Sequence, residues 1–332
     1  MKKAINFVLG SVALFLGSSV LAATAPQIAV SIYSQNDDFM KNYAGELQNA
    51  ANSLNEPIVI NYAQDDMVKE IQQLQLAVES GAKSLIVNPV DPESIGQILK
   101  LAKENGNLPL VFINRKPKDK VLDAYANAWY VGSNAAQSGI FQAEILTDYI
   151  SAHPEADLNK DGKISYFLLQ GEANLPDTEL RSSALKETLD GAETVFEEIG
   201  SVNANWQFDI ALSATESFIR RVGIDKVEAI VANNDAMALG ALQYLKSIGY
   251  NNGDSSKFIP VLGIDGTQIA VDAVNKKQMV GTVKNDFNTQ ARLALKIARM
   301  AGNNETVNKD SLGYAMTADK DIYVPYIKIT LK

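Results

Sequence analysis

Apolar and polar positions follow two patterns that take turns along the chain. Short continuous apolar runs, such as residues 27–33, 84–90 and 108–114, are separated by longer stretches with helical periodicity, such as residues 39–54 and 67–81. Continuous apolar runs of this length are typical of parallel strands that helices cover on both faces. The pattern therefore predicts a doubly wound α/β fold, and about ten such strands fit two sheets better than one.

Short polar side chains stand at the ends of most of these expected strands. In an open parallel sheet, ligands bind beyond the carboxyl ends of the strands. Asn and Asp also cap helices, so capping is an equal alternative at any one position. Capping does not require Asn or Asp at nearly every strand end. The pattern therefore predicts a ligand site. The residues concerned are Asp37, Asn88, Asn114, Glu172, Asn233, Asn234, Asp235, Asp265, Asn285 and Asp286.

The N-terminal segment has the composition of a cleaved leader. Lys2 and Lys3 precede an apolar stretch at residues 4–15, and residues 20–22, Val-Leu-Ala, resemble a cleavage site. The stretch is broken by glycine and is short for a membrane span. We therefore expect a signal peptide at residues 1–22, cleavage after about Ala22, and a periplasmic protein.

Composition and motifs exclude several function classes. The formal net charge of −9 disfavours nucleic acid as a partner, and the absence of cysteine excludes disulfides. The one histidine, His153, has no nucleophile nearby in the sequence, and the chain lacks a G-x-S-x-G elbow and a phosphate-binding loop. Asp37 and Asp265 are of the kind that serve glycoside hydrolysis, so a glycosidase is the enzyme alternative. We expect a binding protein rather than an enzyme.

A binding role fits the residues at the strand ends. Carboxylate and amide groups form hydrogen bonds with hydroxyl groups, and Arg181 adds a rigid set of donors. Phe39 and Trp206 offer flat apolar surfaces for the C–H faces of a sugar ring. Together these side chains indicate a neutral polyhydroxy ligand.

Residues 157–165 form a second candidate site. Acidic or amide side chains occupy its first, third and fifth positions, glycine its sixth and serine its ninth, as in an EF-hand calcium loop. The twelfth position is Leu168, where the motif requires a bidentate glutamate. The segment is therefore either a polar turn or a calcium site that a carboxylate from elsewhere in the chain completes.

Several of these segments resemble one family closely. The stretches IAVSIYSQNDDFM, VFINRKP, DLNKDGKISYFLLQGEANLPDTELR, IVANNDAMALGAL and GTVKNDFNTQA are similar to the galactose/glucose-binding members of the type I periplasmic binding proteins. The resemblance covers nearly all of the chain after the leader and implies two Rossmann-like lobes with a three-segment hinge. It places residues 24–133 and 284–315 in the first lobe and residues 134–283 and 316–332 in the second.

The resemblance also implies a function. The two lobes would close over a monosaccharide, galactose or glucose, and deliver it to the membrane subunits of an ABC importer. The protein would act as a monomer, and a role with a chemoreceptor is open. The LacI-type repressors share a related core, but the leader and the lack of a helix-turn-helix segment speak against them.

The resemblance assigns roles to individual residues. The expected sugar contacts are Asp37, Phe39, Asn114, Asp177, Arg181, Trp206, Asn234, Asp265 and Asn285. The expected ligands of a structural Ca²⁺ ion are the side chains of Asp157, Asn159, Asp161, Ser165 and Glu228, and the backbone carbonyl of Lys163.

Two positions depart from the family pattern. Ser165 stands where relatives usually have glutamine, and Leu175 stands where they usually have a histidine in the sugar site. The leucine side chain forms no hydrogen bond with a sugar hydroxyl, and the loss of one hydrogen bond costs about 0.5–1.5 kcal/mol. The expected ligand is therefore galactose or glucose, with a related sugar that lacks a hydroxyl near Leu175 as the alternative.

Overall fold

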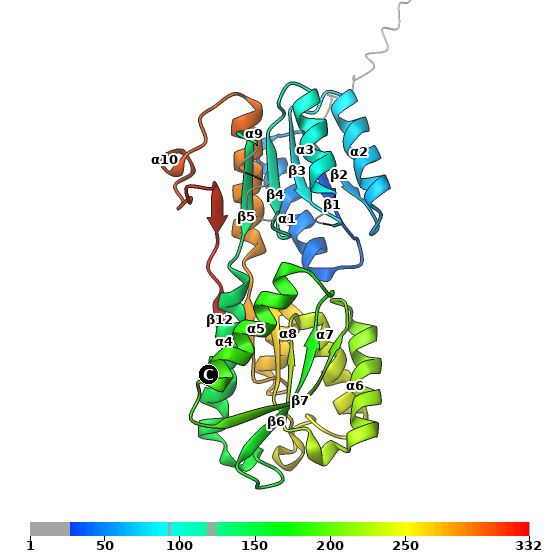
Figure 1. Ribbon diagram of the computed structural model, residues 1–332, viewed down its shortest axis with the longest axis vertical. Coiled ribbons are helices and arrows are strands. Elements are labelled where there is room, and N and C mark those ends of the chain that lie inside the picture. Colours follow the sequence, from blue (N-terminus) through cyan, green and yellow to red (C-terminus); the bar gives the residue numbers. More distant parts are fainter. Residues whose placement is uncertain (1–26, 92–93, 118–121, 123–124, 332) are drawn as a thin grey trace, which may run out of the picture.

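The computed structural model describes residues 27–331 except residues 92–93, 118–121 and 123–124, and the expected leader lies outside the described residues. Two lobes stand end to end in this part of the chain, each around a six-stranded sheet (Figure 1). The first sheet has the order β11 (Asp321–Tyr323), β5 (Ala128–Gly132), β4 (Leu110–Ile113), β3 (Ser84–Asn88), β1 (Ile28–Ile32) and β2 (Ile58–Tyr62). The second has the order β12 (Ile327–Thr330), β10 (Gly281–Lys284), β9 (Val261–Asp265), β8 (Ala229–Ala232), β6 (Lys163–Gln170) and β7 (Val195–Asn203). The expected α/β fold with two doubly wound sheets is thereby confirmed.

Helices follow the strands in both lobes. The first lobe contains α1 (Asp38–Leu54), α2 (Met67–Glu79), α3 (Ile95–Glu104), α9 (Phe287–Gly302) and α10 (Lys309–Leu312). The second contains α4 (Ala135–Ala152), α5 (Pro176–Asp190), α6 (Phe208–Val222), α7 (Asp235–Ser247) and α8 (Gln268–Asn275), with short 3₁₀ turns at Pro154–Ala156, Ile224–Lys226 and Ser255–Lys257. None of the helices in the described ranges is long and apolar enough to cross a membrane.

The alternation of side chains along each strand decides which helices cover which face. In β1, Ile28, Val30 and Ile32 pack beneath α1 and α9, whereas Ala29 packs beneath α2 and α3. The second sheet is covered in the same way, by α6, α7 and α8 on one face and by α4 and α5 on the other. Because both faces are covered, the inner strands bury nearly all of their side chains and leave only their ends for a ligand.

The chain passes between the two lobes at three places in its described part. These crossovers are residues 133–134 after β5, residues 285–286 after β10, and residues 324–326 between β11 and β12. They lie side by side at one edge of the molecule, where α4, α9 and the C-terminal strands meet (Figure 1). Such an arrangement permits the lobes to rotate toward each other about a common axis.

The third crossover differs from the expectation. β11 pairs in parallel with β5, with Asp321 opposite Tyr130, so residues 321–323 belong to the first sheet. The prediction that residues 316–332 lie in the second lobe is therefore wrong for β11. Only β12 continues into the second sheet, where it runs antiparallel to β10. The three-residue strand covers the free edge of β5, whose N–H and C=O groups need partners.

Helices α6 and α7 approach each other closely at a glycine. A Cβ atom on Gly240 would lie 2.3 Å from the Phe208 carbonyl oxygen and 3.0 Å from the Leu212 nitrogen. Gly240→Ala should therefore lower the free energy of unfolding by about 1–3 kcal/mol, as overpacking does. Urea denaturation followed by circular dichroism measures this change.

A glycine in α1 provides the matched control. Nothing lies within 4 Å of a Cβ atom built on Gly45. Gly45→Ala should raise stability by about 0.5–1 kcal/mol, because alanine favours the helix. If the two substitutions changed stability equally, the close packing of α6 and α7 would not depend on the glycine at position 240.

Candidate functional site

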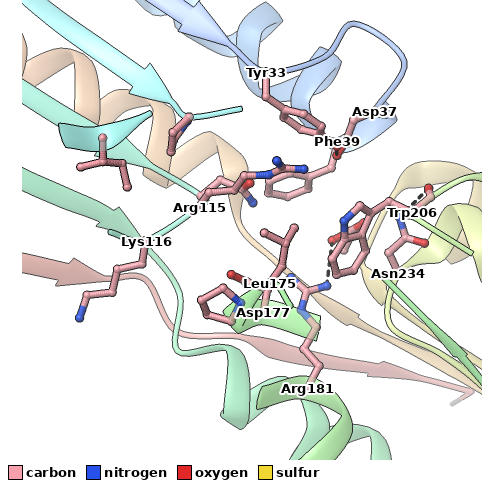
Figure 2. Close-up of a pocket in the computed structure, with 15 residues that line it drawn as sticks. Tyr33, Asp37, Phe39, Arg115, Lys116, Leu175, Asp177, Arg181, Trp206 and Asn234 are labelled. Carbon is pink, nitrogen blue, oxygen red and sulfur yellow. Dashed lines mark hydrogen bonds and ion pairs between the residues drawn. The ribbon is translucent and has the colours of Figure 1, made fainter. Parts of the chain in front are cut away.

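The carboxyl ends of the two sheets face each other and enclose a cavity of about 40 Å³ (Figure 2). The first lobe contributes strand ends and the start of α1 to its wall, and the second contributes α5 and the loops after β7, β8 and β9. The lining residues are Tyr33, Asp37, Phe39, Pro89, Ile95, Asn114, Arg115, Lys116, Leu175, Pro176, Asp177, Arg181, Trp206, Asn234 and Asp265.

The cavity gathers the expected sugar contacts with one exception. Those that line it are Asp37, Phe39, Asn114, Asp177, Arg181, Trp206, Asn234 and Asp265. Asn285 does not line it: this residue is 3% exposed and lies in the second crossover. Its side-chain oxygen accepts hydrogen bonds from Ser133 Oγ and Gln290 Nε2, at 3.0 and 2.6 Å.

The first-lobe wall is organised by Asp37 at the start of α1. Its Oδ1 accepts a hydrogen bond from the Met40 N–H, as a helix cap does, and its Oδ2 accepts one from the Tyr33 hydroxyl at 2.6 Å. Phe39 follows in the first turn, where its ring packs edge-on against Phe287, with centroids 5.9 Å apart. Capping thus fixes the direction of the helix that carries the aromatic wall.

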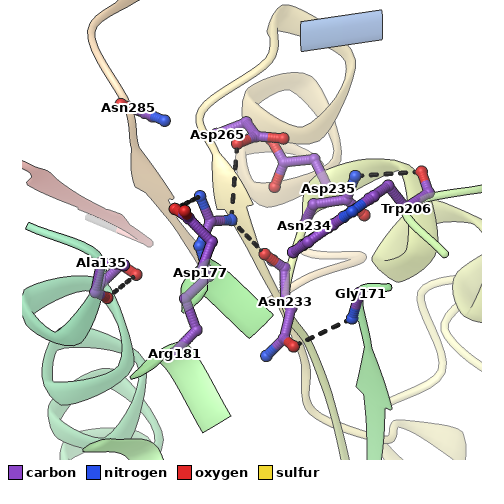
Figure 3. Close-up of polar contacts among 12 residues, drawn as sticks. Ala135, Gly171, Asp177, Arg181, Trp206, Asn233, Asn234, Asp235, Asp265 and Asn285 are labelled. Carbon is purple, nitrogen blue, oxygen red and sulfur yellow. Dashed lines mark hydrogen bonds and ion pairs between the residues drawn. The ribbon is translucent and has the colours of Figure 1, made fainter. Parts of the chain in front are cut away.

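The second-lobe wall is organised by Arg181, which is 4% exposed. Its guanidinium lies 3.7 Å from Asp177 Oδ1 and 4.0 Å from Asp265 Oδ1, and it also donates to the Asn233 carbonyl (Figure 3). Burial raises the pKa of both carboxyl groups, and the positive charge of Arg181 opposes this rise. The buried guanidinium and the two buried carboxyl groups therefore stabilise one another's charges beside the cavity.

The segment after β8 carries both capping and site residues. Asn234 Oδ1 accepts a hydrogen bond from the Met237 N–H and so caps α7, while the same residue lines the cavity. Asn233 lies behind it and accepts from the Gly171 N–H at 3.1 Å. Asp235 accepts from Thr282 and Thr267, and its burial raises its pKa to about 7. Capping and ligand binding are therefore compatible at one position rather than exclusive alternatives.

Trp206 and Asp265 hold unusual backbone conformations at the cavity. Trp206 has φ of 65° and Asp265 has φ of 127°, a region that L-residues rarely adopt. The Trp206 ring covers Gly171 so closely that a Cβ atom there would lie 2.1 Å from it. Such strain is concentrated at functional sites, where the surrounding contacts maintain it.

Arg115 is a cavity residue that the sequence analysis missed. Its guanidinium carbon lies 3.6 Å from the centroid of the Tyr33 ring, and it donates to the Val90 carbonyl. Its other terminal nitrogen lies 2.7 Å from Oε1 of Glu172, which belongs to the second lobe. Its position directly after Asn114, at the end of a strand, is the signal that could have identified it.

Most charged groups on the cavity wall lie beside a group of opposite charge. Arg115 pairs with Glu172, Arg181 with Asp177 and Asp265, and Lys116 Nζ with Asp321 at 2.8 Å. Carboxylates and guanidinium groups that are paired still have lone pairs and N–H groups to offer a ligand. The arrangement therefore suits a ligand that has both hydrogen-bond donors and acceptors.

The loop at residues 157–165 is closed by its own backbone amides. Asp157, Asn159 and Asp161 accept hydrogen bonds from N–H groups within the loop. Glu228, which is fully buried, accepts from the N–H groups of Leu158, Asn159 and Ser165 at 2.8, 3.2 and 2.8 Å. The remote glutamate thus lies against the loop and accepts hydrogen bonds from its backbone.

The donor set of this loop fits Ca²⁺ in kind. Its side chains supply the oxygen ligands that the ion prefers, and Glu228 has no ion-pair partner within the described part of the chain. In that part, however, no three His, Cys, Asp or Glu side chains converge as a metal site requires. Calcium binding at this loop therefore stays a prediction.

Comparison with known proteins agrees with this geometry. The chain is 29% identical to the D-galactose/methyl-galactoside binding periplasmic protein of Haemophilus influenzae, over 99% of this chain and 97% of that protein. It is 27% identical to the ribose import binding protein of Escherichia coli, over 85% and 86%.

Solved structures show the same fold. A solute binding protein from Bacillus halodurans with bound myo-inositol matches with a TM-score of 0.75 and 24% identity, over 93% of this chain and 96% of that one. One from Actinobacillus succinogenes with bound D-allose matches with a TM-score of 0.76 and 19% identity, over 92% and 97%. These are the two-lobed structures of type I periplasmic binding proteins.

Residues 28–306 match the family described as periplasmic binding protein domain. The family and the relatives named above are binding proteins and not enzymes, so the glycosidase alternative has no support. The chain belongs to the periplasmic binding protein domain family.

Proposed function

We propose that this chain binds a monosaccharide in the periplasm and delivers it to an ABC importer. The observation that carries the proposal is the convergence of two aromatic rings, Phe39 and Trp206, with carboxylate, amide and guanidinium groups from both lobes around one cavity. A sugar has apolar C–H faces and a rim of hydroxyl groups, which match these two kinds of wall. The membrane subunits of the importer are the proposed partner, the protein acts as a monomer, and a chemoreceptor is a second partner to test.

Galactose or glucose is the proposed ligand. The Haemophilus relative is named for D-galactose and methyl-galactoside, others are named for ribose, and the solved structures hold myo-inositol and D-allose. All of these ligands are neutral polyhydroxy molecules, and the cavity wall offers donors and acceptors for their hydroxyl groups. Leu175 on the wall offers no hydrogen bond. A related sugar without a hydroxyl at that position is therefore the second candidate.

Ligand entry requires the lobes to separate. The cavity is walled by residues of both lobes, so a sugar that enters it must pass between them. The ion pair of Arg115 and Glu172 joins the lobes at the cavity and breaks when they part. A ligand that bonds to both walls then stabilises the closed state by its greater affinity for it. We propose that the three crossovers are the hinge of this movement.

Ionised carboxylates suit this ligand. Burial raises the pKa of Asp177 and Asp265, and hydroxyl groups that donate to them would favour the charged form. Arg181 offers its remaining N–H groups to the ring or hydroxyl oxygens of the same ligand. The hydroxyl groups of one sugar would thus donate to the carboxylates and accept from the neighbouring guanidinium.

The two tryptophans of the chain provide a test of the site. Trp206 lines the cavity, whereas Trp129 is buried in β5 outside the cavity wall. Galactose or glucose should change the fluorescence of the parent and of Trp129→Phe, and the change should vanish in Trp206→Phe. Calorimetry should show that Trp206→Ala binds at least about tenfold more weakly, which is roughly 1.4 kcal/mol. A signal that persists without Trp206 would place the ligand elsewhere.

We further propose that the loop at residues 157–165 binds a structural Ca²⁺ ion. Its ligands would be the side chains of Asp157, Asn159, Asp161, Ser165 and Glu228, with the carbonyl of Lys163. The support is the acidic loop itself and the buried Glu228 carboxylate that lies against it. Bound Ca²⁺ would stabilise the second lobe, since this loop joins α4 to β6.

Calcium should raise the melting temperature of the parent and not that of Glu228→Gln. A ligand at 100 times its dissociation constant stabilises the folded state by about 2.7 kcal/mol. The matched control is Glu70→Gln, because Glu70 is also fully buried but lies in the first lobe, and this variant should keep the calcium effect. Thermal melts with calcium and with a chelator measure the difference. An undiminished shift in Glu228→Gln would remove Glu228 from the metal site.

A further inference from the structure

One hydroxyl group contacts all three crossovers between the lobes. Ser133 lies in the first crossover, and its Oγ is 3.0 Å from Asn285 Oδ1 in the second and 2.7 Å from the Val324 carbonyl in the third. Gln290, from the first turn of α9, donates its Nε2 to Ser133 Oγ at 3.0 Å and to Asn285 Oδ1 at 2.6 Å. These four residues are called the hinge knot below.

The hinge knot fixes the orientation of the Asn285 amide. Its Oδ1 is held by Ser133 and Gln290, so a flipped amide would place N–H groups against the Gln290 N–H groups. The Asn285 Nδ2 has no partner within the described part of the chain. Figure 3 shows it turned toward the side on which Asp265 and Arg181 lie. The amide therefore presents donors to the cavity side and its acceptor to the hinge.

The hinge knot is linked directly to the cavity wall. The Asn285 N–H donates to the Asp265 carbonyl at 3.0 Å, and Asp265 lines the cavity with its unusual φ of 127°. The Ser133 hydroxyl has one proton and serves either the Val324 carbonyl or Asn285 Oδ1 at a time, while Gln290 Nε2 donates to Asn285 in both cases. Asn285 is therefore bonded to Ser133 through its side chain and to the Asp265 carbonyl through its backbone N–H.

We propose that Ser133 is a positioning residue for ligand binding, which joins the three crossovers and orients Asn285 behind Asp265. The inference rests on the proposed function, because it concerns the closure of the lobes over a sugar. Ser133 does not line the cavity and acts through its neighbours. Its hydrogen bonds keep the three crossovers together when the lobes rotate toward each other.

The test combines affinity with the distance between the lobes. Gln72→Cys in α2 and Ser213→Cys in α6 place spin labels on exposed residues of opposite lobes, in a chain that has no other cysteine. In the parent, galactose should shorten and narrow the distance distribution. Ser133→Ala should broaden the distribution even without sugar and raise the dissociation constant for galactose about five- to tenfold. Ser133→Thr, which keeps the hydroxyl, should restore both.

The control separates positioning from mere stability. Thr215→Val removes a buried hydroxyl that bonds to the Ala211 carbonyl inside α6, so it should lower stability and leave distance and affinity unchanged. If Ser133→Ala keeps the parent's distance distribution and an affinity within twofold, the inference is overturned. If the parent binds none of the sugars tested, the proposed function fails, and the distances without sugar alone decide the role of Ser133, with an unchanged width overturning it.

Discussion

The buried guanidinium of Arg181 is the constraint on which the site depends. A charge taken out of water needs compensation from nearby groups, and only the ends of parallel strands and the starts of helices can supply these without disrupting the sheet. Asp177, Asp265 and the Asn233 carbonyl meet this need from three different segments. The result is a rigid polar wall that forms before any ligand arrives, so little ordering is required when a sugar binds.

Arg115 has the corresponding place on the opposite wall, but its charge partner lies across the gap. Its stacking on Tyr33 and its bond to the Val90 carbonyl hold it to the first lobe, while Glu172 reaches it from the second. A partly buried ion pair of this kind forms only when the lobes meet. The charges of the second-lobe wall are therefore paired within that lobe, whereas Arg115 on the first-lobe wall finds its partner only when the lobes close. The crossovers determine how the two walls come together.

Part of the site could be predicted from the sequence, because strands that are buried on both faces expose polar side chains to a ligand mainly at their ends. That rule places Asn234 and Asp265 at the cavity. It does not identify Arg115, because basic side chains are common on surfaces. Asn285 also follows a strand, but its side-chain oxygen bonds within the crossovers and the residue does not line the cavity. The family resemblance placed residues 321–323 in the second lobe, whereas they pair with β5 of the first.

The central claim is that a monosaccharide lies between the lobes with one ring face on each aromatic wall. A crystal structure of the protein with galactose tests this most directly. The expected result is a sugar between Phe39 and Trp206, with its hydroxyl groups within hydrogen-bonding distance of Asp265 and Arg181. A sugar bound outside the cavity, or one that touches a single lobe while the lobes stay apart, would contradict it.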